Sequence, residues 1–145
     1  MAVISSNNAS ITIIAQNFPL PIVVENFDPD SDMLKFDDIQ TADAEKTPDG
    51  KVNIWSINAL ITCTLNLSGG AWESTAEKLA LLLNNQQRFG SVLSFVPNVT
   101  MIVNYGNGTI KTFPNGVMTT GQSAPSLGNQ KILPSAWQFK FGEVI

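Results

Sequence analysis

Three aspartates in the stretch DPDSD have the spacing that comes closest to a chemical site. Asp28, Asp30 and Asp32 match the first three ligand positions of a calcium-binding loop. Such a loop also needs glycine at its sixth position and a bidentate acid at its twelfth, where this sequence has Met33 and Ile39. Because the match fails at the most specific positions, we expect solvated acids in a turn and no metal site.

The other groups that catalysis requires are scarce. The chain has no histidine, so the commonest general base and metal ligand is missing. Cys63 is the single cysteine, and in its apolar surroundings we expect a small hydrophobe rather than a nucleophile. The neighbouring acids Asp37 and Asp38 would serve an acidic-residue hydrolase only in a cleft that the sequence does not indicate. We therefore expect no enzymatic activity and no cofactor.

The composition favours a β-rich protein with one core. Of 145 residues, 43% are apolar and only 14% are charged, which suits one domain over residues 1–145. Low charge also suits a subunit whose surface is covered by copies of itself. The beginning of the chain has no basic region before its apolar residues, and no stretch approaches about 20 apolar residues. We expect neither a secretion signal nor membrane insertion.

The charge is distributed unevenly along the chain. Residues 1–50 contain nine acids and two lysines, a net of −7, and residues 51–145 contain three acids and six bases, a net of +3. This division is compatible with a solvated acidic loop on an ordinary domain. It is equally compatible with complementary faces on a subunit that stacks on itself. A net charge of −4 does not favour wrapping a nucleic-acid backbone.

The first third of the chain predicts two short strands and an extension. Ser10–Ala15 and Leu20–Phe27 have the composition of strands. Residues 28–50 form a long extended loop or hairpin, in which residues 33–40 could pair as a strand. TPDG, at Thr47–Gly50, places proline and glycine where a turn favours them.

A long alternating stretch follows this extension. A strand is predicted from Asn53 to Leu67, in which from Trp55 onward the odd positions are apolar and the even positions are small and polar except for Leu60. This period of two predicts one strand with a buried and a wetted face. Its fifteen residues would extend roughly 50 Å at about 3.3 Å per residue, whereas strands usually have about 5–6 residues. We expect such a strand to bend around a barrel or to reach beyond its own subunit.

The next segment is the one predicted helix, at about residues 74–89. STAE is a capping box, in which Ser74 caps the backbone and Glu77 bonds back to it. Leucines and alanines at helical spacing form one apolar stripe, and Gly90 is a natural stop. We expect this stripe to lie on a sheet.

The remainder of the chain is predicted to be β. Residues 99–105 and 109–113 form a hairpin, and PNG at 114–116 makes a further turn. A polar loop, residues 119–130, precedes a closing strand with alternating aromatic residues. The predicted fold class is mainly β: a small antiparallel β-barrel or two packed β-sheets with one flanking α-helix and the long loop or hairpin.

This order of parts resembles the tube proteins of contractile phage tails and their relatives in type VI secretion. The resemblance rests on the N-terminal strands, a loop ending in a DG turn, the strand VNIWSINALITCTLNL, the helix core LALLLN and the closing strand SAWQFKFGEV. It spans nearly the whole chain. It implies a single tail-tube-like domain, six copies of which form a ring. Such rings would stack head to tail into a hollow inner tube for DNA ejection.

The resemblance also implies partners and a location. The partners would be other copies of the chain, the tail sheath protein, baseplate and tail-terminator proteins, and, within the lumen, the tape measure protein and genomic DNA. The location would be the tail of a virion that is assembled in the host cytoplasm. The same resemblance covers a baseplate tube-initiator or a tail-terminator protein. A different class, a β-sandwich that binds carbohydrate or protein through Trp72, stays open as an alternative.

Two sets of residues follow from this hypothesis. The acidic extension would contact a neighbouring subunit or ring through Phe36, Asp37, Asp38, Ile39, Asp43, Glu45 and Asp49. The even positions of the long strand would face the channel, because uncharged side chains do not hold phosphates. These positions are Ser56, Asn58, Thr62, Thr64 and Asn66.

Overall fold

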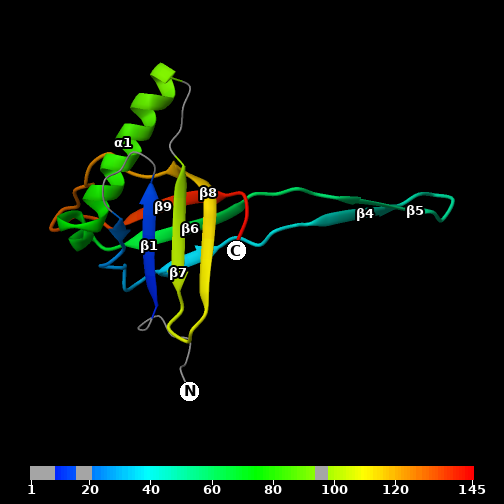
Figure 1. The fold of residues 1–145 in the computed structure, drawn as a ribbon, viewed down its shortest axis with the longest axis horizontal. Helices are drawn as coiled ribbons and strands as arrows, with labels where there is room; N and C mark the ends of the chain where they lie inside the picture. Colours follow the sequence, from blue (N-terminus) through cyan, green and yellow to red (C-terminus); the bar gives the residue numbers. More distant parts are fainter. Residues whose placement is uncertain (1–8, 16–20, 94–97) are drawn as a thin grey trace.

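A computed structural model of the chain describes residues 9–15, 21–93 and 98–145 (Figure 1). It contains a seven-stranded antiparallel sheet in the order β2-β1-β7-β8-β9-β6-β3 and a two-stranded sheet of β4 and β5. The large sheet is formed by β1 (Ser10–Ala15), β2 (Ile22–Val23), β3 (Leu34–Phe36), β6 (Ile61–Leu67), β7 (Val99–Asn104), β8 (Ile110–Thr120) and β9 (Ser135–Phe141). The small sheet is formed by β4 (Ala42–Lys46) and β5 (Val52–Ser56). The helical elements are a 3₁₀ helix η1 (Gly69–Glu73) and α1 (Thr75–Leu93).

The mainly β fold with one flanking helix is therefore confirmed, in the form of two antiparallel sheets. The large sheet comes close to closing on itself, because residues 24–28 cross from β1 to β6. The Val24 amide donates to the Ile11 carbonyl at 2.9 Å, and the Asp28 amide donates to the Asn66 carbonyl at 3.0 Å. Among the described residues, however, no continuous strand ladder joins the two ends into a closed barrel.

The core follows from the alternation within the strands of the large sheet. In β9, Trp137, Phe139 and Phe141 are all fully buried, which confirms the predicted closing strand. Their neighbour Phe113, in β8, has its ring centroid 5.6 Å from that of Phe141. Burying several aromatic side chains in one layer supplies a large part of the driving force for folding.

The predicted turn at PNG is wrong, because β8 continues through these residues. The pairing of β8 with β7 shifts between Met101 and Val99, and Asn115 takes a positive φ of 56°. These are the features of a β-bulge, which bends a strand without ending it. Gly116 follows the bulge and lies directly against Phe141.

Gly116→Ala is expected to destabilise the fold by about 1–3 kcal/mol, the usual cost of overpacking. An added Cβ would lie 2.1 Å from Cδ1 of Phe141 and 2.9 Å from the Lys140 carbonyl oxygen. The Phe141 ring is fully buried and packs against Phe113 and Phe139, so a shift of the ring would disturb both contacts. Urea denaturation measures the effect, with Gly142→Ala as the control, because Gly142 also lacks a positive φ and only the Asn115 carbonyl oxygen, at 4.0 Å, would lie near a Cβ added there. Equal losses for both variants would contradict the packing argument.

The helix begins one residue later than predicted, and it continues through Gly90 to Leu93, so the predicted stop at Gly90 is wrong. Its beginning is also held differently from the prediction. The Ser74 hydroxyl is buried and has no hydrogen-bond partner among the described residues, so the predicted capping box is wrong. Instead, the Thr75 hydroxyl accepts a bond from the Glu25 amide at 3.1 Å and donates to the Val23 carbonyl at 3.3 Å. The start of α1 is therefore fixed by tertiary contacts with the segment around β2, and its buried residues, such as Leu79, face the core.

The predicted single strand from Asn53 to Leu67 is also wrong. It is divided into β5 and β6, which residues 57–60 connect. The predicted alternation holds only in β6, where Cys63, Leu65 and Leu67 are buried. In β5 every residue is exposed, including Trp55, because β5 pairs with β4 outside the body of the protein.

Residues 37–60, which we call the arm, project from the large sheet on the side away from α1 (Figure 1). The predicted extension at 28–50 is thus only partly right. β3 at its beginning pairs with β6 in the body, and the hairpin proper joins β4 to β5. The predicted turn at Thr47–Gly50 is confirmed: the Gly50 amide donates to the Thr47 carbonyl at 2.9 Å, and Gly50 has φ 89°.

Candidate assembly surfaces

The arm has two chemically different faces. Ala44 pairs with Ile54 and Lys46 with Val52, and residues directly opposite each other share one face of a ladder. We call this the apolar face of the arm; Ala42 and Ser56 complete it at the end near the body. The other face, which we call the acidic face, consists of Asp43, Glu45, Asn53 and Trp55.

Among the residues that the structure describes, none covers either face. All ten residues of β4 and β5 are exposed, and Ile54 and Val52 have 74% and 58% of their surface accessible. A lone two-stranded hairpin is at best marginally stable in water, and each of its outer edges presents unpaired backbone groups. Exposed apolar side chains next to free strand edges are features of a surface that binds another protein chain.

The turn at the end of the arm carries a firmly ionised acid. The Thr47 hydroxyl donates to the Asp49 carboxylate, and this bond, together with one from the Lys51 backbone, holds the pKa of Asp49 below its ordinary value. The Lys51 ammonium lies 4.0 Å from the same carboxylate. These contacts fix the geometry of the turn and keep a charge at its tip.

The structure separates the predicted contact residues into two groups. Six of them lie on the arm and are exposed: Asp37, Asp38, Ile39, Asp43, Glu45 and Asp49. Phe36 belongs to β3 in the body, where its ring centroid lies 5.0 Å from that of Phe113. Phe36 thus packs on the core, while the other six are free to contact a partner.

The predicted channel-facing residues do not share one surface. Thr62, Thr64 and Asn66 lie on the face of β6 that points away from the core, because they alternate with its buried residues. Ser56 lies on the arm, and Asn58 lies in the connection between β5 and β6. The predicted grouping relied on one continuous strand, which the structure does not contain.

Sequence reasoning missed two lysines that lie beside this face of β6, on the two neighbouring strands. Lys35 in β3 is opposite Thr64, and Lys140 in β9 is opposite Thr62. The alternation of Lys140 with buried Phe139 and Phe141 could have placed it on the outer side of a strand. Only the strand order of the sheet, however, puts both lysines beside β6, so this face is not free of charge.

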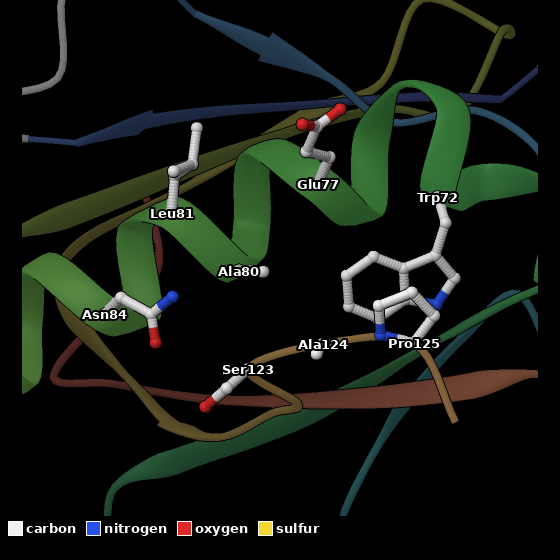
Figure 2. Close-up of a pocket in the computed structure, with 8 residues that line it drawn as sticks. All are labelled: Trp72, Glu77, Ala80, Leu81, Asn84, Ser123, Ala124 and Pro125. Atoms are coloured by element: carbon white, nitrogen blue, oxygen red, sulfur yellow. The ribbon is translucent and has the colours of Figure 1, made fainter. Parts of the chain in front are cut away.

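A groove of about 350 Å³ lies between α1 and the loop that follows β8 (Figure 2). We call it the helix groove. Its apolar lining consists of Trp72, Ala80, Leu81, Ala124 and Pro125, and its polar lining consists of Glu77, Asn84 and Ser123. Figure 2 shows the Trp72 ring and Pro125 at one end, with Asn84 and Ser123 at the other. The Trp72 ring is half-buried and backed by Trp137, with 5.9 Å between the ring centroids.

The acidic residues considered for calcium binding do not form a metal site in the described part of the chain. The prediction of solvated acids in DPDSD holds for Asp30 and Asp32, which are exposed, but not for Asp28, which is buried. The Asp28 carboxylate accepts a bond from the Asp30 amide at 3.2 Å. In the described ranges, no three His, Cys, Asp or Glu side chains gather in a way that could hold a metal ion. Within the same residues, no helix combines the length and the apolar character that a membrane span needs.

Cys63 is expected to resist thiol reagents in the folded protein. Burial, with a smaller contribution from the charge of Asp37, raises the pKa of its thiol from 9.0 to about 12. Labelling at pH 8 should proceed only after denaturation, and a reagent such as dithionitrobenzoate measures it. The raised pKa also makes the folded state bind the proton more tightly, so this contribution to stability is complete below pH 9 and is lost as pH rises towards 12. Rapid labelling of the native protein would contradict this prediction.

Comparison with known proteins places the chain among tail proteins. The model of a family described as tail fiber protein gp32 matches residues 2–145, whereas no curated protein matches the chain. A sheath/tube terminator of PVC, an extracellular contractile injection system, has a similar structure with a TM-score of 0.59 and 14% identity, over 99% of this chain and 95% of that chain.

Two further structures have the same fold. A chain of the PVC sheath-tube complex has a TM-score of 0.55 and 15% identity, over 93% of this chain and 86% of that chain. A chain of the anti-feeding prophage baseplate has a TM-score of 0.55 and 12% identity, over 95% of this chain and 91% of that chain. Identities this low establish a shared fold. Because the family model spans residues 2–145, the chain belongs to the tail fiber protein gp32 family and is a tail-related protein with a fold found in contractile injection systems.

Proposed function

We propose that this chain is a structural subunit that forms a hexameric ring at one end of the tube of a contractile tail, as a tube terminator or a baseplate component. The observation that carries the proposal is the arm, whose two faces are exposed and whose two strands pair, within the described part of the chain, only with each other. The similarity to a tube terminator, which covers 99% of this chain and 95% of the other, supports the position at the end of the tube.

The placement of the arm determines the kind of assembly that it can support. The arm projects from the body on the side away from α1 (Figure 1). A contact between an arm and a different surface of the next copy is heterologous, and such contacts form a ring when the rotation between copies closes and an open filament when it does not. Pairing the arm with a neighbour would also remove its exposed strand edges.

The second candidate is the major subunit of the tube, in which stacked rings form the conduit for DNA. The similarity to a chain of a sheath-tube complex favours it, as do the small polar residues Thr62, Thr64 and Asn66 on the outer face of β6. Lys35 and Lys140 on the same face weaken it, because cations in a channel wall hold phosphates instead of letting them slide.

The partners in this proposal are other copies of the chain, the adjoining tube or baseplate, and the sheath. Tape measure protein and genomic DNA would pass through the ring, and the assembled ring would belong to the tail of a virion or a tail-like particle. The whole chain would act as one tail-type domain. No catalytic step is part of the proposal.

Electron microscopy of the purified protein, combined with its mass in solution, tests both candidates. Single six-fold rings that do not stack would support a terminator or baseplate role. Long hollow tubes would favour the major tube subunit. A strict monomer at every concentration and salt would contradict both, and a glycan and peptide screen around Trp72 would then test the alternative of a binding module.

A further inference from the structure

We propose that the helix groove receives the apolar face of the arm of a neighbouring copy. This inference rests on the proposed function and goes further, because it names the receiving surface and the face of the arm that binds it. In the contact, Val52 and Ile54 would cover the apolar part of the groove beside Leu81.

The apolar face of the arm and the helix groove both expose apolar side chains to water. Ile54 and Val52 are the most exposed apolar residues of the β4–β5 hairpin, and Leu81 is 52% exposed at the rim of the groove. Each exposes apolar area that burial would remove from water, at about 25 cal/mol per Å². The groove volume of about 350 Å³ is large compared with the roughly 30 Å³ that one water molecule occupies in the liquid, so it can hold side chains from a strand.

The charge of Glu77 determines which face of the arm fits the helix groove. Glu77 is the one charged residue among those that line the groove, and it is exposed. The acidic face of the arm would bring Asp43 and Glu45 towards it, which is unfavourable. The apolar face brings Lys46 instead, so only this face matches the groove in both charge and polarity.

The position of the two surfaces requires a second copy. The arm extends from the side of the large sheet that lies away from α1 (Figure 1), and the groove is built on α1 itself (Figure 2). An arm therefore cannot reach the groove of its own chain. Each copy presents one arm and one groove, a heterologous pair of surfaces that links identical subunits into a ring when the rotation between neighbours closes.

Site-specific cross-linking tests the contact. Copies carrying Ile54→Cys are mixed with copies carrying Leu81→Cys, and disulfide formation is followed during assembly. Both positions are exposed, so the substitutions should not disturb folding, and buried Cys63 can remain in place. We expect a covalent dimer only in the mixture, and a ladder up to the size of the ring when one chain carries both cysteines.

Asn53→Cys, on the acidic face of the arm, is the matched control, because it lies one residue away and points to the opposite side. It should cross-link to Leu81→Cys at least about tenfold more slowly, since a disulfide needs Cα atoms within about 7 Å and converging side chains. A charge exchange gives a second measurement. Lys46→Glu or Glu77→Lys alone should raise the concentration for half-assembly by up to about fivefold, and the two together should restore it.

The outcomes separate this inference from the proposed function. If the wild-type chain forms rings but Asn53→Cys cross-links as fast as Ile54→Cys, or neither cross-links, the groove is not the receptor, although the ring proposal stands. If the wild-type chain forms no assembly under any condition, both proposals fail. Fast cross-linking at Ile54 alone, together with rescue by the charge exchange, supports the groove.

Discussion

Replacing Val52 and Ile54 together by aspartate is expected to abolish ring assembly and to leave the subunit folded. Both side chains are exposed on the arm and contact no part of the core. The substitution therefore removes apolar area that only a partner would bury, and it adds two negative charges to an arm that is already acidic. Static light scattering and electron microscopy report assembly, while thermal unfolding followed by circular dichroism reports the fold.

The subunit itself should unfold within about 0.5 kcal/mol of the wild type, as is usual for surface substitutions. A variant with Val23→Asp and Ile110→Asp is the matched control. These two residues lie on strands of the large sheet and are about as exposed as Val52, so the control adds the same charge to the body of the protein. Rings from the doubly substituted arm variant would refute the role of the arm, and loss of rings in the control alone would place the contact on the large sheet.

Trp137→Ala is expected to lower the free energy of unfolding by about 3–5 kcal/mol, the range for removing a large aromatic residue from a core. Trp137 is fully buried, and its indole N–H donates to the Ser135 hydroxyl at 2.8 Å. Its ring also packs on Trp72, which lines the helix groove. Removing it would leave a cavity beneath the groove and a buried hydroxyl without its donor. Urea denaturation of dilute, unassembled protein measures the loss.

Trp55→Ala is the control for the loss of a tryptophan as such. Trp55 is 44% exposed on the acidic face of the arm, so its removal should change the stability of the isolated subunit by less than about 0.5 kcal/mol. The two variants together distinguish a tryptophan that holds the core from one that is available to a partner. Equal destabilisation would mean that the arm folds together with the body, contrary to its projection away from the large sheet.

Much of the fold could be predicted from the sequence where the signal is local. The alternation in Ser10–Ala15 and in the closing strand with Trp137, the hairpin that leads into Ile110, and the turn at Thr47–Gly50 all follow from periodicity and turn chemistry, and the structure contains each of them. Alternation requires only that the two sides of a strand meet different surroundings. The alternating pattern is therefore the same whichever other strand lies beside the strand.

The errors have a common cause, because each depended on contacts between residues distant in the sequence. PNG has the composition of a turn, but the pairing of β8 with β7 on one side and β9 on the other keeps it in a strand. Ser74 and Glu77 have the spacing of a capping box, but contacts with the segment around β2 place the Thr75 hydroxyl in the structural role. Local propensity is a weak guide where tertiary packing satisfies the same groups differently.

The sequence by itself determined that this chain is mainly β, has one amphipathic helix, and contains a long acidic extension before an alternating stretch. Only the tertiary structure decided that the alternating stretch is divided between the arm and the body, that Lys35 and Lys140 lie beside Thr64 and Thr62, and that α1 borders a groove. The physical reason is that alternation of apolar and polar residues records a difference between two faces of a strand, but not what covers them. In β6 the chain's own core covers the apolar face, whereas in β5 none of the described residues does.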